Sequence, residues 1–226
     1  MSPRGLSKRE ETPVSKKERT LSPAEQERKE QFQRTCEEME ARGYRKKDLT
    51  VGVVQANIMA LVVMLPFVLA VGWIYYAVNP AGAFAFEIGL WEYWVFLLAL
   101  IVLVVLHEGI HGLTWGMLAE GRFRSIRFGV IWKALTPYCT CSSPLKRWQY
   151  ILGGAMPTLI LGFGLAAAGI ALGSFWVFAV AQLMILSGGG DFFIILKLLL
   201  YRPGGGEALY YDHPYECGVV VFEKDR

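Results

Sequence analysis

The sequence predicts an all-α membrane protein with four transmembrane helices, a short β hairpin at the cytosolic surface between helices 2 and 3, and an N-terminal cytosolic helix. Hydrophobic residues make up 54% of the 226 residues and the mean hydropathy is +0.34, which is more apolar than an ordinary soluble domain. Four apolar stretches, at about 56–78, 93–118, 150–172 and 175–200, are each long enough for a helix that crosses the hydrocarbon core. Basic residues are also distributed unevenly between the segments that connect these stretches.

The distribution of Lys and Arg predicts the orientation of the helices. Residues 1–49 hold 13 of the 23 basic residues and residues 119–149 hold six, whereas the loop 79–92 holds none. Because Lys and Arg are enriched in cytosolic loops, we expect both termini and the 119–149 segment to lie in the cytosol. The loop 79–92 and the turn at Gly173 then face outward. We expect a multi-pass protein of the plasma membrane, surrounded by the lipid bilayer.

Residues 1–49 are expected to form a cytosolic N-terminal segment with a disordered start. Their basic residues are mixed with about half of the acidic residues of the chain. Such mixed charge indicates a solvated segment, so we expect no nucleic-acid partner. A helix is predicted over residues 23–42, because Pro23 suits the first helical position and Gly43 can end the helix in the left-handed conformation.

Residues 50–202 are predicted to form the four-helix membrane domain, and residues 203–226 a polar cytosolic tail. Polar and apolar residues alternate in part over residues 122–131, and this pattern ends near Pro137. The alternation predicts the surface hairpin between the second and third helices. In the tail, residues 219–222 are β-branched or aromatic, so they can add one more short strand.

The four cysteines, Cys36, Cys139, Cys141 and Cys217, lie on segments that we place in the cytosol. Thiols stay reduced there, so a disulfide framework is not expected. Cys139 and Cys141 have no Cys or His partner at zinc-ribbon spacing, and we therefore expect no metal site at this pair.

The second apolar stretch contains the sequence His107-Glu108-Gly109-Ile110-His111. Residues four apart lie on one face of a helix, so His107 and His111 can offer imidazole nitrogens to one Zn²⁺. Glu108 lies next to them and can act as the general base that takes a proton from zinc-activated water. Ionisable residues are costly inside a membrane helix, which favours a functional role for the three side chains.

The fourth apolar stretch contributes Asp191. If Trp91 and Phe175 mark the outer ends of their helices, His107 and Asp191 are both about 16 residues deep, or roughly 24 Å at about 1.5 Å per residue. The two helices run in the same direction, so Asp191 can meet the histidine pair and become the third metal ligand. The alternative is a lone Asp that is hydrogen-bonded within the bundle. Lys197 lies near the cytosolic end and can snorkel to the surface.

Three glycines, Gly188 to Gly190, directly precede Asp191. Consecutive glycines loosen or break a helix, and unwound backbone at membrane depth is tolerated where it lines a wet cavity. The alternative is that these glycines only let helices pack closely. His213 in the tail is expected to be solvated, and substitution of Asp212 or His213 is expected to leave metal binding and hydrolysis unchanged.

The chain resembles the site-2 protease group of intramembrane zinc peptidases and, more narrowly, a small bacterial family of putative zincin-like membrane peptidases. The residues that carry this resemblance extend over most of the chain: Gly43-Tyr44, Asp48-Leu49, the run from Leu106 to Gly112, Pro137-Tyr138, Ala155-Met156-Pro157, Gly190-Asp191 and the tail from Asp212 to Gly218. The resemblance implies His107, His111 and Asp191 as zinc ligands and Glu108 as general base. The chain departs from the better-known members after Asp191, where Phe192 and Phe193 follow instead of glycine.

The leading hypothesis is a membrane-embedded zinc metallopeptidase that hydrolyses peptide bonds of a membrane protein or peptide substrate in or next to the membrane. An alternative is a non-catalytic membrane adaptor or regulator with a structural or vestigial metal site. Glu108 argues against it, because a structural site needs ligands but no base. A small transporter with a His and Asp proton relay is a third hypothesis, but it predicts ionisable residues at several depths of several helices.

Overall fold

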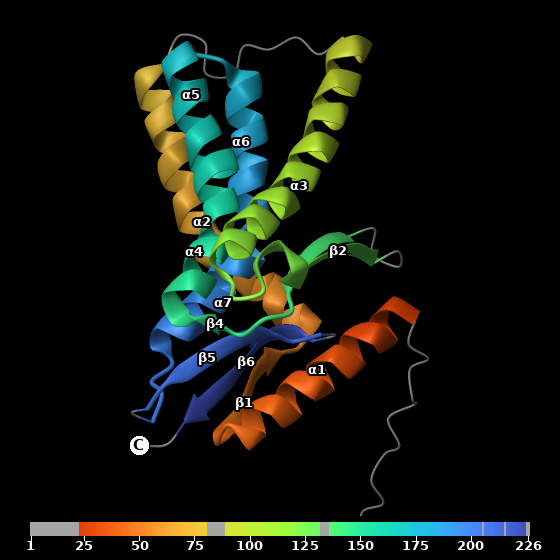
Figure 1. The fold of residues 1–226 in the computed structure, drawn as a ribbon. Helices are drawn as coiled ribbons and strands as arrows, with labels where there is room; N and C mark the ends of the chain where they lie inside the picture. The colour runs from red at the N-terminus through yellow and green to blue at the C-terminus, as the bar shows by residue number, and fades with distance from the viewer. Residues whose placement is uncertain (1–22, 81–88, 132–135, 205, 215, 225–226) are drawn as a thin grey trace, which may run out of the picture.

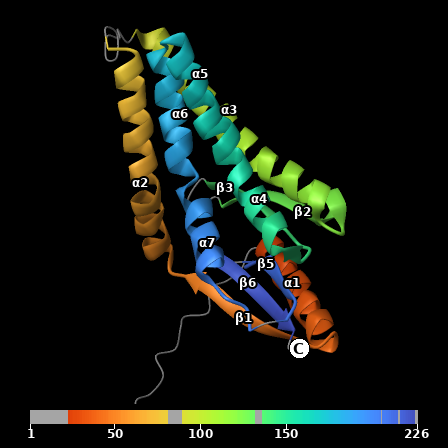
Figure 2. The same ribbon diagram turned by 90° about the vertical axis from the view of Figure 1, so that its left-hand side faces the viewer.

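The computed structural model of the protein describes residues 23–80, 89–131, 136–204, 206–214 and 216–224, and the statements below concern these residues. Within them the chain is mostly helical, with a two-stranded and a four-stranded sheet (Figure 1). Long helices form one end of the molecule, and the four-stranded sheet with the first helix forms the other end (Figure 2). The site described below lies between these two parts.

Within the described ranges, three helical segments are long and apolar enough to cross a membrane. They are α2 (Val53–Val78), α3 (Leu90–Leu118) and a continuous segment composed of α4 (Arg147–Pro157), the π-helical turn η2 (Thr158–Gly164) and α5 (Leu165–Leu172). A fourth span is added if the bent pair α6 (Phe175–Ser187) and α7 (Gly189–Leu200) crosses as one. These segments are consistent with the predicted membrane protein.

The bent pair breaks at Gly188, where the helix axis turns by 44°. The prediction that the glycine run would break the fourth helix is therefore confirmed. α2, α5 and α6 pack together around the buried side chains of Met64, Ala166, Ala181 and Ile185. α3 diverges from this group toward Leu90 and approaches it at the opposite end, where α3 packs on α4 (Figure 1).

The surface hairpin consists of β2 (Ile126–Ile131) and β3 (Thr136–Cys141), which pair antiparallel with Ile126 opposite Cys141. It begins later than the alternation predicted. Residues Arg122–Ser125 instead form a 3₁₀ turn, η1. Arg122 has a positive φ of 49°, and its N–H donates to the Ala119 carbonyl at the end of α3. The first four residues of the alternating pattern therefore turn the chain away from α3 instead of extending it.

The all-α class is wrong in one respect, because a four-stranded antiparallel sheet was not predicted. Its order is β1-β6-β5-β4, with bounds β1 Tyr44–Val51, β4 Leu145–Lys146, β5 Ala208–Asp212 and β6 Cys217–Lys224. Only residues 219–222 of this sheet were predicted as a strand. The N-terminal and C-terminal segments thus pair with each other, which a division of the chain at 49 and 203 does not anticipate. β1 contains four consecutive charged residues, so its sequence lacks the alternation of polar and apolar residues that predicts a strand.

The helix α1 (Pro23–Ala41) covers one face of this sheet (Figures 1 and 2). It lies close to the predicted range 23–42, and Gly43 follows with a φ of +82°, the left-handed conformation that ends the helix. The predicted N-terminal boundary borders residues outside the described ranges. Phe32 and Met39 of α1 pack against Val220 and Phe222 of β6.

The other face of the sheet packs against the ends of the membrane helices. Its core contains Tyr210, Val219 and Val221 from the sheet together with Tyr150 of α4 and Leu198 of α7. Lys197 donates from Nζ to the Leu49 carbonyl of β1 at 2.7 Å, so this cation lies at the junction with the sheet. The sheet is thereby attached directly to the two helices that flank the candidate site.

Candidate metal centre

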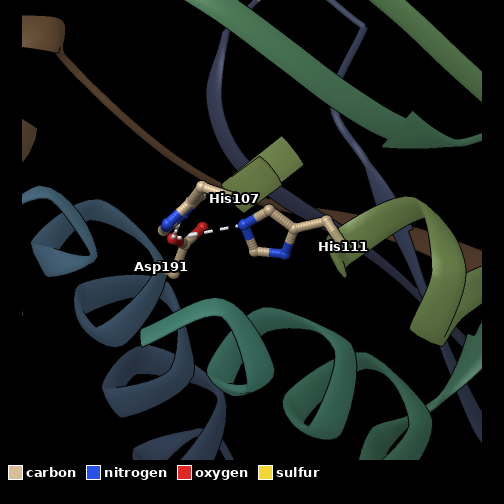
Figure 3. A group of neighbouring side chains, drawn as sticks. All are labelled: His107, His111 and Asp191. Atoms are coloured by element: carbon tan, nitrogen blue, oxygen red, sulfur yellow. Dashed lines mark hydrogen bonds and ion pairs between the residues drawn. The ribbon is translucent and has the colours of Figure 1, made fainter. Parts of the chain in front are cut away.

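His107 and His111 lie one turn apart on the same face of α3 and are both buried, with 7% and 3% of their surfaces exposed. Their ring centroids are 4.9 Å apart and the ring planes meet at 74°. Both imidazoles point toward the first turn of α7 (Figure 3). The spacing of four residues therefore produces the shared face that the sequence predicted.

Asp191 lies in the first turn of α7, directly after the break at Gly188. Its Oδ2 atom is 3.3 Å from Nε2 of His107 and 3.4 Å from Nε2 of His111 (Figure 3). All three ligand atoms lie within 4.8 Å of one another. The structure thus brings together the two histidines and the aspartate whose equal depth the sequence indicated. Their role as zinc ligands stays a prediction.

The donor set and its spacing fit a zinc ion. Zinc is bound tetrahedrally by His nitrogens and carboxylate oxygens at about 2.0–2.2 Å, which places neighbouring ligand atoms about 3.3 Å apart. The distances from the Asp191 oxygen to the two imidazole nitrogens match this separation. Two neutral imidazoles and one carboxylate leave a fourth position open, as in catalytic zinc sites.

His111 is held in one orientation by α4. Its Nδ1 atom is 2.8 Å from the Gly153 carbonyl oxygen. Because a carbonyl oxygen can only accept, Nδ1 carries the hydrogen and donates it, which leaves the Nε2 lone pair directed at the centre. The indole of Trp115 stacks on the His111 ring, with centroids 5.0 Å apart and an interplanar angle of 16°.

Gly153 is required for this arrangement. A Cβ atom at this position would overlap the Trp115 indole, so only glycine lets α4 approach α3 closely enough for the hydrogen bond to His111. His107 is less constrained, because its buried Nδ1 atom has no hydrogen-bond partner within the described part of the chain. The two candidate ligands thus differ in how firmly the protein orients them.

Glu108 lies outside the group of three ligand atoms but lines the same cavity. This cavity has a volume of about 660 Å³. Its wall includes Asn57 and Ala60 of α2, Cys139 of β3 and Asp212 of β5. A water molecule and an extended peptide fit a space of this size. Glu108 therefore lies beside the candidate ligands and faces the same cavity.

Several lining residues were missed by sequence reasoning. Asn57 is a polar residue within an apolar stretch, and this signal could have identified it. Tyr150 begins the third apolar stretch, and Asp212 begins the tail segment that the resemblance includes, but neither residue was assigned a role at the site. Asp212 is joined to Tyr150, whose OH donates to Oδ1 at 2.5 Å, and to Cys141, whose N–H donates to Oδ2 at 3.0 Å.

The expectation of a solvated His213 is wrong. The ring is half-buried, lies 5.6 Å from the Phe32 ring and accepts a hydrogen bond at Nδ1 from the Glu216 N–H. Burial lowers the pKa of His213. It lies against α1 because the C-terminal segment folds as strands of the sheet and does not extend into solvent.

The two cysteines of β3 are buried and carry no disulfide. Burial raises the pKa of Cys141 to about 12 and that of Cys139 further still. A thiol must lose its proton to bind a metal, so both are poor ligands at neutral pH. Their burial thus gives a physical reason for the expectation that the Cys139–Cys141 pair holds no metal.

Comparison with known proteins supports a zinc peptidase. Residues 100–205 match the model of a family described as "Putative zincin peptidase". The matched segment contains His107, Glu108, His111 and Asp191. No curated protein and no solved structure matches the chain. The family match supports a zincin-like metallopeptidase, and such a family implies zinc, in agreement with the cluster of two histidines and one aspartate.

Proposed function

We propose that the protein is a membrane-embedded zinc metallopeptidase of the site-2-protease type, which hydrolyses peptide bonds in or next to the membrane. One observation carries the proposal: the Asp191 carboxylate lies 3.3–3.4 Å from two buried imidazoles of another helix. Glu108 adjoins them in a cavity of about 660 Å³. A half-buried carboxylate beside two buried imidazoles is costly in an apolar bundle unless the group has a partner such as a metal.

His107, His111 and Asp191 would hold the zinc ion, and Glu108 would be the general base. When bound, zinc supplies Lewis-acid activation of a water molecule and polarisation of the peptide carbonyl. Glu108 accepts the proton from the attacking water and passes it to the nitrogen of the leaving amine. The hydrogen bond from His111 to the Gly153 carbonyl keeps Nε2 directed at the centre throughout.

The cavity wall supports a peptide substrate in an extended conformation. Residues 137–140, which belong to β3, lie along the cavity, so the hairpin can present backbone groups to a substrate strand. The segment 53–61 of α2 exposes large apolar side chains, among them Val54, Ile58 and Leu61. These features favour a membrane protein or an apolar peptide as the substrate.

A hydrolysis assay on the full-length protein tests this function. The purified protein, in detergent or in liposomes, is incubated with a mixture of synthetic peptides that correspond to membrane spans and their flanks, and products are identified by mass spectrometry. We expect cleavage by the wild type that a chelator stops and added zinc restores, and a loss of about 10²–10⁴-fold in Glu108→Gln. Zinc binding without cleavage that depends on Glu108 would instead indicate the non-catalytic adaptor.

We also propose that both termini and the sheet are cytosolic and that the protein is a multi-pass protein of the plasma membrane. The excess of Lys and Arg in residues 1–49 and 119–149 supports this orientation. Reporter fusions at Arg226 test it, because an alkaline phosphatase fusion should be inactive and a fluorescent protein fusion active. The reverse result would place the sheet outside and contradict the charge argument.

A further inference from the structure

Asp212 connects three elements that surround the candidate site. It is the last residue of β5 and lines the same cavity as His107, Glu108 and Asp191. Its carboxylate accepts a hydrogen bond from the Tyr150 OH on α4 and one from the Cys141 N–H on β3. A single side chain of the C-terminal segment thus joins the sheet, the hairpin and α4.

The contacts continue from Tyr150 to His111. The backbone carbonyl of Tyr150 accepts a hydrogen bond from Nε1 of Trp115 at 3.3 Å, and the Trp115 indole stacks on the His111 ring. Three residues beyond Tyr150 on the same helix, the carbonyl of Gly153 receives the hydrogen bond from His111. The position of α4 therefore determines the orientation of His111 through two separate contacts.

Even a half-buried carboxylate is costly in this place. Burial raises the pKa of Asp212, while the hydrogen bonds from Tyr150 and Cys141 act in the opposite direction. An unpaired charge would be destabilising in such surroundings, and a neutral polar or apolar residue would fill the space at lower cost. The two donors that face the carboxylate come from different elements, α4 and β3. The carboxylate can therefore fix the position of these two elements relative to each other.

We propose that Asp212 is a positioning residue for the metal centre, which fixes the imidazole of His111 through Tyr150, α4 and Trp115. Partners beyond the ligand shell orient the ligands and tune metal affinity. The four-stranded sheet is then part of the zinc centre and not an accessory. The consequence for zinc affinity rests on the proposed function, whereas the orientation of His111 can be measured without metal.

The test compares Asp212→Ala, Asp212→Asn and Tyr150→Phe with the matched control Asp48→Ala, an exposed aspartate on β1 of the same sheet. Zinc affinity of the full-length protein is measured by competition with a chelator of known affinity. Contrary to the expectation from the sequence that an Asp212 substitution leaves metal binding unchanged, we expect Asp212→Ala to weaken the zinc affinity by about 10–100-fold, the usual loss for a partner of a ligand. Asp212→Asn should retain most of the wild-type zinc affinity, because the amide oxygen accepts one of the two hydrogen bonds.

The second measurement is the imidazole ¹⁵N spectrum of the metal-free protein. The chain has three histidines, so substitution of each assigns the signals. In the wild type, His111 should show a protonated Nδ1. Asp212→Ala should shift or broaden the His111 signals and leave those of His107 nearly unchanged. Tyr150→Phe should reproduce part of this spectral change. The double variant of Asp212→Ala and Tyr150→Phe should change the His111 signals no more than Asp212→Ala alone.

Each outcome decides the proposal. A folded Asp212→Ala protein with the zinc affinity of Asp48→Ala and an unchanged His111 spectrum overturns it. If Asp212→Ala does not fold, Asp212→Asn and Tyr150→Phe decide through the same two measurements. If the wild type binds no zinc, the proposed function fails, while the ¹⁵N spectra still show whether Asp212 orients His111. If the wild type binds zinc and the Asp212 and Tyr150 variants keep its zinc affinity and its His111 spectrum, the proposed role of Asp212 is wrong and the proposed function stands.

Discussion

The membrane helices and the four-stranded sheet use polar residues in opposite ways. In α3 and α7 such residues are few, and His107, Glu108, His111 and Asp191 all line one cavity. In β1, four consecutive charged residues are exposed. A charge costs far more among apolar helices than at a wet surface. A polar residue within the helices therefore indicates a functional site from the sequence alone. The role of a polar residue in the sheet follows only from its contacts in the structure.

Asp212 is an exception to this contrast between the helices and the sheet. It belongs to a strand of the sheet, but its half-buried carboxylate accepts hydrogen bonds from Tyr150 of α4 and Cys141 of β3. The sheet thus contains one carboxylate that lines the cavity of the candidate site, Asp212, and one that is exposed at the surface, Asp48. If this is so, the environment and contacts of a carboxylate or a glycine, and not its residue type, determine the effect of its substitution on zinc binding and stability.

The largest effect is expected for the histidines. His107→Ala and His111→Ala each remove one of three candidate ligands, so zinc content should fall from about one per chain to nearly none and affinity by more than about 100-fold, which exceeds the loss of a partner of a ligand. Elemental analysis of the purified protein checks this. Glu108→Gln is the control, because a base that is not a ligand should leave zinc content largely unchanged. Equal zinc loss in Glu108→Gln would make the glutamate a ligand.

Asp191→Ala should also weaken zinc binding strongly, because it removes the only carboxylate within 4 Å of both imidazoles in the described part of the chain. Asp191→Glu keeps the charge but moves it by one methylene, so we expect partial zinc binding with poorer geometry and little hydrolysis. The absorption bands of the cobalt-substituted protein report this change in geometry. A wild-type cobalt spectrum in Asp191→Ala would exclude the carboxylate from the coordination shell.

A steric change near the site should have an intermediate effect. Gly153→Ala places a methyl group against the Trp115 indole, so the indole and the stacked His111 must shift. We expect a loss of about 1–3 kcal/mol in unfolding free energy and weaker zinc binding. Gly164→Ala is the control in the same helical segment, because the added Cβ there lies 3.5 Å from the nearest atom, the Leu159 carbonyl oxygen. Equal effects of the two substitutions would show a general loss of helix packing.

The helices and the proximity of Asp191 to the histidines could be predicted from the sequence. The length of an apolar stretch, and the depth of a residue within it, can each be counted along one segment of the chain. His107 and Asp191 needed only a count of residues from the outer ends of their helices. The sheet could not be predicted, because β1 pairs with β6 from the opposite end of the chain. The polar residues of β1 conceal its alternation, since just one of its eight residues, Tyr44, is fully buried.

The role of Asp212 was hidden for the same reason. Its partners Tyr150 and Cys141 lie 62 and 71 residues away in the sequence, and no spacing rule relates residues that meet only after the sheet has formed. A polar tail residue is solvated in most proteins, and that expectation was wrong for its neighbour His213. In this region the contacts, and not the composition, identify the residues that matter.

The smallest effect is expected for Asp48, the exposed counterpart of Asp212 in the same sheet. Its Oδ2 atom lies 3.4 Å from Nζ of Lys46, with 45% and 34% of the two side chains exposed. An exposed ion pair contributes about 0–1 kcal/mol and weakens further with salt. Asp48→Ala should therefore change the unfolding free energy by less than about 0.5 kcal/mol and leave zinc affinity unchanged. Thermal unfolding at low and high salt, beside Asp212→Ala, measures the difference. A loss for Asp48→Ala as large as that for Asp212→Ala would mean that burial does not separate the two carboxylates, and the contrast between helices and sheet would fail.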